Sequence, residues 1–364
     1  LGRIYTINSY NGFYEDLSYV QSESMDFSSD DITLSHMSGV SAHDYQRKTL
    51  DYFWDYHQYA GIDGNGKRTV SVVNYGPGGG ISVNNAFYNA ALDVLTYGRG
   101  SGSYRAFCAA QDIVTHEFVH GFTAHTSGIV YRNQSGALNE SMSDAFGFFV
   151  EAEYQNGGDW TQGEDVYTNG GASRSFIDPP SEGHPDNINH PYFVDYNSNP
   201  LWSNDFGGVH TNLGIPNKIL YLVIAGDTHY GINVNPFDED FDISRIVASN
   251  IWFNWNAYYL DAEDDFLLAR EKMLEVVYDM YPSRSDYYQT VANAWASTGV
   301  GDSMMDGDIN QDQIINIQDI ILMLQFALGN VNLEIVQMML ADINSDGNID
   351  VMDIIQVVNI ILYG

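Results

Sequence analysis

The segment Val114–His120, VTHEFVH, constrains this chain more than any other, because it can hold a metal ion and activate a water molecule together. His116 and His120 stand four residues apart, so on a helix both imidazoles leave one face and reach a single ion. Glu117 lies at the edge of that face, where it can take a proton from a metal-bound water. The pattern predicts a zinc hydrolase. The alternative is a surface helix with two histidines that bind nothing.

The balance of charge limits the partners of the chain. Its 364 residues include 48 acidic and 14 basic ones, which gives a net charge of −34 and disfavours nucleic acid and anionic membrane surfaces. A saline environment or a demand for cation ligands explains such acidity, and much of it lies in calcium-type patterns. We therefore expect no nucleic-acid partner. We also expect a monomer.

Two further features concern the cellular compartment. The single cysteine, Cys108, excludes an intrachain disulfide and is expected to be a small buried residue. No run of about 18 apolar residues predicts a membrane span, and the chain starts at Leu1 without a signal segment. We expect a secreted, extracellular protein in its mature form, after removal of a signal and a pro-segment.

Local patterns predict a helix and two extended pieces before the histidines. Aromatic and aliphatic residues recur at helical spacing from Val40 to Tyr59. Thr69–Asn74 is a strand by its β-branched content, and Ile81–Tyr88 is another extended piece. Asn84 and Asn85 suit a sheet edge that offers amide groups to an extended peptide, while the alternative is a simple turn.

A second long helix is expected over Ala137–Tyr154. Its acids Glu140, Asp144 and Glu151 fall within about 40° of one another at 100° per residue. The residues around them are apolar, so burying three carboxylates would be costly unless cations or hydrogen bonds met them. An acidic face turned toward the helix of the two histidines satisfies that requirement better than a solvated face.

These motifs together resemble the thermolysin family of zinc endopeptidases. Glu140 follows His120 by twenty positions, within GALNESMSDAFG. The other matching blocks are NNAFYN at 84–89, ASRS around Arg174, NDFGGVHTN at 204–212 and THYG at 228–231. The resemblance covers most of residues 40–300.

The resemblance implies an α+β, two-lobed metallopeptidase fold. A mixed β/α lobe is expected over residues 1–135 and a mainly helical lobe over residues 136–300. Apolar residues at helical spacing from 215 to 300 agree with the second lobe.

The resemblance also implies how peptide bonds are hydrolysed. One zinc ion has water as its fourth ligand, and its protein ligands are His116, His120 and Glu140. Glu117 acts as general base and then general acid. The oxyanion receives hydrogen bonds from His210 and Tyr131.

Other residues orient these groups or hold the substrate. Asp144 is expected to orient His116, and Asp205 to orient His210. The substrate main chain is held by Arg174, Asn85 and the backbone of Ala86.

The resemblance further implies one or two calcium ions in the peptidase, since clustered carboxylates suit a hard cation. Their ligands are Asp112, Glu151, Asp159 and Glu164.

The pocket for the residue after the scissile bond departs from the family. Gln162 and Ser173 align with apolar lining positions, whereas Phe107, Ile113 and Val166 remain apolar. A preference for a large apolar residue there is therefore only partly supported.

Beyond Gly301 the composition shifts and an internal repeat of 34 residues appears. Oxygen-bearing side chains recur at positions 1, 3, 5, 9 and 12 of two loops, which resemble EF-hand loops with a final Asp. They are Asp308, Asn310, Asp312, Asn316 and Asp319, then Asp342, Asn344, Asp346, Asp350 and Asp353. Helices are expected after the loops, over Ile320–Leu328 and Ile354–Leu362.

This repeat, over residues 302–364, resembles a dockerin, a small all-α module that binds two calcium ions and a cohesin-like scaffold protein. Dockerins have small polar residues before the final Asp of each loop, where this chain has Val351 and Met352 in the second. Gln313 stands where the second loop keeps Gly347. The apolar pair either binds another surface or folds back on the peptidase.

Two functions remain. One is a secreted zinc endopeptidase whose tail serves calcium-dependent attachment or intramolecular docking. The alternative is a catalytically silent protein that anchors through the tail. The zinc, base and oxyanion positions are all filled, which favours the first.

Overall fold

A computed structural model of the chain describes residues 3–9, 18–19, 34–76, 83–155, 157–344 and 346–363. The chain divides into two compact units. The first unit contains Leu1–Asp186, His190–Tyr221 and Trp252–Asp265, and the second contains Asn187–Asn189, Leu222–Ile251 and Phe266–Gly364. In the described ranges no helix has both the length and the apolar character that a membrane span needs.

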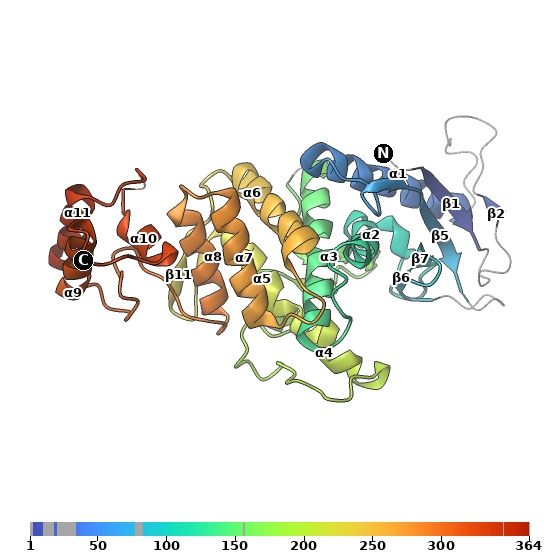
Figure 1. The fold of residues 1–364 in the computed structure, drawn as a ribbon. Coiled ribbons are helices and arrows are strands. Elements are labelled where there is room, and N and C mark those ends of the chain that lie inside the picture. The colour runs from blue at the N-terminus through green and yellow to red at the C-terminus, as the bar shows by residue number, and fades with distance from the viewer. Residues whose placement is uncertain are drawn as a thin grey trace. The chain divides into compact units, whose positions relative to one another are not determined.

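The first unit is built on a five-stranded sheet of order β2-β1-β5-β7-β6 (Figure 1). The strands are β1 (Ile4–Asn8), β2 (Ser18–Tyr19), β5 (Thr69–Tyr75), β6 (Ala86–Asn89) and β7 (Val94–Gly98). Strands β1, β5 and β7 run parallel, and β6 pairs antiparallel with β7. Strand β6 is thus an edge strand that pairs in the sheet with β7, and an edge strand of this kind can pair with an extended peptide.

The predicted strand over Thr69–Asn74 is confirmed by β5, which buries Val72 and Val73. The extended piece predicted over Ile81–Tyr88 is only partly described, because residues 81–82 lie outside the described ranges. Its visible part enters the sheet at Ala86.

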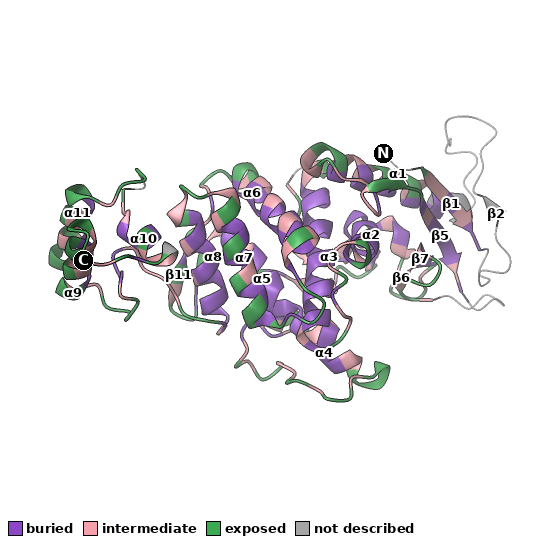
Figure 2. Ribbon diagram, in the orientation of Figure 1, coloured by how far each residue is buried: buried purple, intermediate pink, exposed green. Residues whose placement is uncertain are grey.

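The helices of this unit carry the acids and histidines of the predicted site. They are α1 (Leu34–His57), α2 (Gln111–His125), α3 (Asn133–Tyr154), α4 (Asp205–Asn212) and most of α5 (Gly214–Ala225). Helices α1 and α2 pack on the sheet. Both α2 and α3 are buried along most of their length (Figure 2). The ring of Phe53 lies 5.1 Å from that of Phe118 and 4.9 Å from that of Phe146, which joins α1, α2 and α3 in one aromatic core.

Two predicted helices begin earlier than expected. The helix predicted from Val40 starts at Leu34 and runs through Gly39, and the helix predicted from Ala137 starts at Asn133. Small and polar residues at these ends lowered the helix signal, and packing against the rest of the unit compensates for it. Cys108 is buried, as predicted, and its thiol donates to the carbonyl of Ser38 at 3.3 Å.

Short elements complete the first unit. Its two-residue and three-residue strands are β3 (Ala60–Gly61), β4 (Asn65–Lys67), β8 (Thr161–Gln162) and β9 (Arg174–Ser175). Its 3₁₀ turns span Phe107–Ala109, Glu164–Val166, Pro179–Glu182 and Trp202–Asn204, and a π-helical turn spans Trp255–Tyr259.

The second unit is mainly helical. It holds the hairpin of β10 (Asp227–His229) and β11 (Ile232–Val234), most of α6 (Phe241–Asn254), α7 (Phe266–Met280) and α8 (Ser285–Ser297). Trp295 joins α8 to α7, because its indole N–H donates to the sulfur of Met273 at 3.3 Å. This agrees with the helical character predicted for residues 215–300.

The end of the chain has a core of its own. Helices α9 (Ile317–Ala327) and α11 (Val351–Tyr363) follow the two predicted loops and confirm the predicted helices, each with an earlier start. A further helix, α10 (Ile335–Ala341), lies between them in sequence. Their buried cluster consists of Ile309, Met323, Leu333, Ala341 and Val357.

Candidate active site and metal centre

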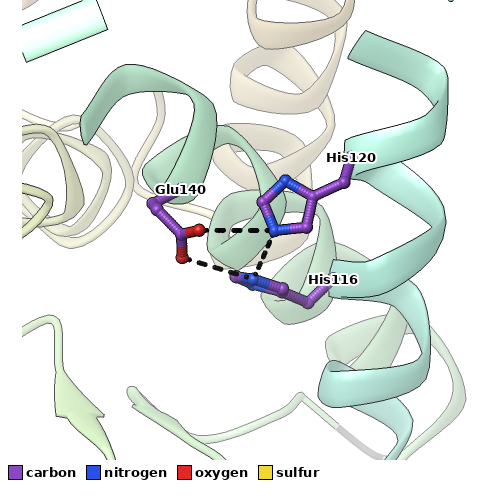
Figure 3. A group of neighbouring side chains, drawn as sticks. All are labelled: His116, His120 and Glu140. Atoms are coloured by element: carbon purple, nitrogen blue, oxygen red, sulfur yellow. Dashed lines mark hydrogen bonds and ion pairs between the residues drawn. The ribbon is translucent and has the colours of Figure 1, made fainter. Parts of the chain in front are cut away.

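His116 and His120 project from α2 toward Glu140 of α3 (Figure 3). Their Nε2 atoms lie 3.0 Å apart, and each lies 3.4 Å from one carboxylate oxygen of Glu140. Spacing by four residues puts both rings on one face of α2, and the close packing of α2 on α3 brings the carboxylate to them. Possible ligand atoms of all three residues lie within 4.8 Å of one another.

The second nitrogen of each ring faces a hydrogen-bond acceptor. Nδ1 of His116 lies 2.8 Å from Oδ1 of Asp144, and Nδ1 of His120 lies 2.7 Å from Oδ1 of Asn139. A neutral imidazole that donates from Nδ1 keeps a lone pair on Nε2. Two ring lone pairs and a carboxylate then converge with no proton between them, so the group needs a cation.

Without a metal ion, the carboxylates beside His116 favour a proton on its ring. Burial lowers the pKa of His116, but hydrogen bonds to Asp144 and Glu140 outweigh burial and raise it to about 10. Two imidazoles and one carboxylate are the ligand types of a catalytic zinc site. The residues therefore fit zinc.

Asp144 is placed where it can orient His116. Its Oδ1 also accepts from Nη1 of Arg174 at 3.0 Å, and its Oδ2 accepts from Nδ2 of Asn217 at 2.8 Å. Arg174 donates in addition to Glu140 at 3.2 Å. Arg174 thus donates hydrogen bonds both to Glu140 of the metal group and to Asp144 behind His116.

Glu117 lies beside this group and is buried, with 5 % of its surface exposed. Its Oε2 has no hydrogen-bond partner among the described residues. Burial raises the pKa of Glu117 to about 7. A carboxylate with one free oxygen in a cleft is the arrangement that a general base needs.

Tyr131 and His210 form a hydrogen-bonded chain that ends at the metal group. The hydroxyl of Tyr131 donates to Oε1 of Glu140 and lies 3.0 Å from Nε2 of His210. Nδ1 of His210 lies 2.5 Å from Oδ1 of Asp205. Burial lowers the pKa of His210, but the charges of Glu140 and Asp205 outweigh it and raise the pKa above its usual value.

The turn that presents His210 is strained. Asp205 and Phe206 have φ values of 54° and 49°, and Gly207 and Gly208 follow with 88° and 85°. Left-handed backbone is costly for a residue with a side chain such as Phe. The turn lets Asp205 accept from both the ring and, at 2.9 Å, the backbone N–H of His210.

These groups line one cleft of about 750 Å³ in the first unit. Its wall includes nine residues predicted from the sequence: His116, Glu117, His120, Glu140, Tyr131, His210, Arg174, Asn85 and Ala86. Asp144 and Asp205 are not part of the wall and contact His116 and His210. Phe107, Ile113, Gln162 and Ser173 also line the cleft, whereas Val166 is fully buried.

A second group of carboxylates lies at the far end of α3. Oxygens of Glu151, Asp159 and Glu164 lie within 4.8 Å of one another. Asp112 is completely buried nearby, where burial and the charge of Glu164 raise its pKa to about 8. Burial and the charge of Asp112 likewise raise the pKa of Glu151 to about 10, and Oε2 of Glu151 has no hydrogen-bond partner among the described residues. The four predicted acids fit a hard cation such as calcium.

The two loops of the tail share one hydrogen-bond pattern. Asp308 accepts from the backbone N–H groups of residues 312 and 313, as Asp342 does from those of residues 346 and 347. Asp319 accepts from residues 310 and 316, as Asp353 does from residues 344 and 350. The remaining predicted loop residues are Asn310, Asp312, Asn316, Asn344, Asp346 and Asp350, whose side chains are exposed or half-buried.

Three residues near the cleft were missed by the sequence reasoning. Asn139 accepts from His120, Asn217 donates to Asp144, and His184 lines the cleft. Asn139 directly precedes Glu140, which is a usable signal. Nothing local marks Asn217 or His184.

The fold and the cleft define a metallopeptidase of the type that binds its metal through two histidines of one helix and a glutamate of the next. A family model described as the thermolysin metallopeptidase catalytic domain matches residues 2–124, and one described as its alpha-helical domain matches residues 127–300. The chain belongs to the thermolysin family.

Individual relatives agree with this assignment. Bacillolysin of Brevibacillus brevis is 38 % identical over 267 residues, which are 72 % of this chain and 46 % of that protein. Thermolysin of Alicyclobacillus acidocaldarius subsp. acidocaldarius is 37 % identical over 267 residues, 72 % of this chain and 45 % of that protein. The chain thus spans about half the length of these relatives.

A solved structure shows the same fold. The precursor of protealysin, a metalloproteinase from Serratia proteamaculans, superposes with a TM-score of 0.66 at 25 % identity. The match covers 83 % of this chain and 88 % of that chain.

Proposed function

We propose that this chain is a secreted zinc endopeptidase. The observation that carries the proposal is the convergence of His116, His120 and Glu140 beside the unpaired oxygen of Glu117. Zinc held by those three residues would polarise the substrate carbonyl and would lower the pKa of water, so that water could lose a proton near neutral pH and attack the carbonyl carbon. Membership of the thermolysin family supports the proposal. The presence in the cleft of every predicted zinc, base and oxyanion residue also supports it.

The protein residues handle the proton and the developing charge. Glu117 takes a proton from the attacking water on its free oxygen and delivers it to the leaving amine nitrogen. The Nε2–H group of protonated His210 and the hydroxyl of Tyr131 both donate to the oxyanion. To do so, the two groups give up their contact with each other, and Tyr131 gives up its hydrogen bond to Glu140. Asp205 keeps His210 charged and in place during that change.

The substrate backbone is held in an extended form along β6. Ala86 supplies main-chain groups at the free edge of the sheet, and Asn85 supplies an amide at the same end. Arg174 lines the cleft next to Glu140 and is within reach of a substrate carbonyl.

A comparison of the wild type with Glu117→Ala tests the mechanism. Both proteins are expected to bind one zinc ion, and the variant is expected to lose about 10²- to 10⁴-fold in kcat on a quenched fluorescent peptide. Glu239→Ala, at an exposed position of the second unit, is the matched control. Equal turnover by the wild type and Glu117→Ala would contradict the role of Glu117 as general base. A wild type that binds zinc without cleaving peptides would favour the silent anchoring protein.

We further propose calcium sites and an attachment module. One or two ions are held by Asp112, Glu151, Asp159 and Glu164, and one by each loop of the dockerin-like module, residues 302–364. The lobes of the peptidase are proposed as residues 1–135 and 136–300. The matching hydrogen bonds of the two loops support the module, and the exposure of Val351 and Met352, 63 % and 54 %, supports a role in contact with another surface such as a cohesin-like scaffold.

Metal analysis of the full chain tests the loops. The wild type is expected to hold two more calcium ions than an Asp308→Ala/Asp342→Ala double variant. Equal calcium content in the two proteins would show that the loops do not bind the ion.

A further inference from the structure

One part of the cleft wall has a chemistry that peptide hydrolysis does not require. It is a recess formed by Phe107, Ile113, Gln162 and Ser173. Ile113 stands three residues before His116 on α2, so the recess opens on the face that carries the metal ligands. A substrate side chain next to the scissile bond would therefore enter it.

The Gln162 side chain is buried in this part of the cleft wall. The residue is 1 % exposed, and its Oε1 has no hydrogen-bond partner among the described residues. The amide lies against Gly147 of α3, where an added Cβ would come 3.2 Å from Oε1. A Gln amide offers two N–H donors and one carbonyl acceptor. Turning the amide over exchanges the donor and acceptor that face the cleft.

The position of Gln162 is fixed by its backbone. Residues Thr161–Gln162 of β8 pair with Arg174–Ser175 of β9, and the carbonyl of Gln162 accepts from the N–H of Ser173 at 2.8 Å. Gly163 has a φ of 77°, and its N–H donates to the buried Asp112. These contacts fix the backbone of Gln162 in the cleft wall.

Gly163 lies between the polar residue Ser173 and the apolar residue Ile113 of this recess. A Cβ there would meet the Ser173 hydroxyl at 3.0 Å and Cδ1 of Ile113 at 3.5 Å. The hydroxyl of Ser173 adds a second neutral hydrogen-bonding group beside the amide of Gln162. Phe107 and Ile113 supply the apolar surface opposite.

We infer that this recess selects a substrate side chain with a neutral amide or hydroxyl on a short apolar stem, such as Asn, Gln or Thr. The inference rests on the proposed endopeptidase function and concerns the residue that the family resemblance places after the scissile bond. A large apolar side chain would leave the buried oxygen of the Gln162 amide without a partner, whereas a side-chain amide or hydroxyl would donate to it. A cationic side chain would meet Arg174 in the same wall.

Matched peptides test the inference on the full chain loaded with zinc and calcium. One pair differs by Asn or Leu after the scissile bond, the other by Thr or Val, so that size stays nearly constant within each pair. The wild type is expected to favour the polar member of each pair by about tenfold in kcat/KM, the worth of about one hydrogen bond. Gln162→Met, which keeps the length of the side chain, is expected to reverse the Asn/Leu preference.

A second variant and a control keep the outcome readable. Ser173→Ala removes the other polar group and is expected to weaken the Thr preference, while Gln318→Met changes an exposed residue of the tail and should leave both ratios unchanged. Cleavage by the wild type that favours Leu and Val, or ratios that neither variant changes, would overturn the inference alone. If no peptide is cleaved by the zinc-loaded wild type, the proposed function fails and the inference fails with it.

Discussion

The hydroxyl of Tyr88 donates a 2.6 Å hydrogen bond to Oδ1 of Asp93, and this contact joins the edge strand β6 to the turn that leads into β7. The ring of Tyr88 lies over Gly121 of α2, where an added Cβ would come within 3.2 Å of it. Asp93 pairs with Lys67 and also lies 3.4 Å from Nε2 of His125, the last residue of α2. It does so from a left-handed backbone with a φ of 56°.

Loss of this hydrogen bond should loosen the strand on which substrate is held. We expect Tyr88→Phe to lower kcat/KM for peptides by about fivefold, mainly through KM, because one hydrogen bond is worth about 1 kcal/mol. Zinc content should stay at the wild-type level. Asp93→Asn keeps an acceptor for Tyr88 and tolerates the left-handed backbone, so its loss should be smaller than that of Asp93→Ala.

Steady-state kinetics on one peptide series check this expectation. Tyr363→Phe, at a residue 82 % exposed, is the matched control. If Tyr88→Phe and Asp93→Ala both kept the wild-type KM, the contact would have no part in holding substrate.

The metal centre could be predicted because its signals are local. His116 and His120 share a helical face by their spacing, and Glu140 lies on a helix whose apolar surroundings leave a carboxylate only a polar or metal partner. The same periodicity predicted α1 and α3, although not their first residues. Helix ends depend on packing that lies outside the segment itself.

The rest of the site depends on residues that are distant in sequence. Asn217 reaches Asp144 across 73 residues, and Lys67 reaches Asp93 across a strand. No spacing rule relates such positions, because the contact exists only after the sheet and helices have assembled. The polar character of Gln162 was visible in the sequence, whereas its burial without a partner was not.

Asp144 provides a test of how the carboxylate behind a ligand sets metal affinity. Its carboxylate forms hydrogen bonds with the ring of His116, with Arg174 and with Asn217. We expect Asp144→Asn to weaken zinc binding by about 10- to 100-fold, because an amide cannot stabilise the ring and the guanidinium as a carboxylate does. Competition with a zinc chelator measures the affinity, with Asp55→Asn on the exposed side of α1 as control. Equal affinities would mean that Asp144 has no influence on the metal.

His57 should make the protein sensitive to mild acid. Its ring stacks on Phe253 at 4.3 Å, and burial lowers its pKa from 6.5 to about 3. Between pH 6.5 and 3 the His57 ring is protonated in the unfolded chain but neutral in the folded chain. The free energy of unfolding therefore falls as the pH falls from about 6.5 toward 3. His57→Phe removes this effect, and the difference in unfolding free energy between the two proteins should change by about 1.4 kcal/mol per pH unit. Urea unfolding at pH 6, 5 and 4 measures it, and a constant difference across that range would contradict it.

The carboxylates around Glu151 should give opposite results with and without calcium. Glu151→Gln keeps the shape of a side chain that is 3 % exposed and removes a carboxyl group whose pKa is raised to about 10 by burial and by the charge of Asp112. In a calcium chelator we expect the variant to melt at a higher temperature than the wild type, because the folded wild type has to take up a proton on this carboxyl or keep like charges buried together, and the amide needs neither. In millimolar calcium the order should reverse, because the variant has lost a ligand and with it part of the stabilisation that binding gives the folded state, about 2.7 kcal/mol at a hundredfold excess over Kd. Calorimetry in the two buffers decides the matter, since the tail loops are common to both proteins and cancel. A variant that is less stable than the wild type by the same amount in both buffers would show that Glu151 only packs there and that this group of acids binds no calcium.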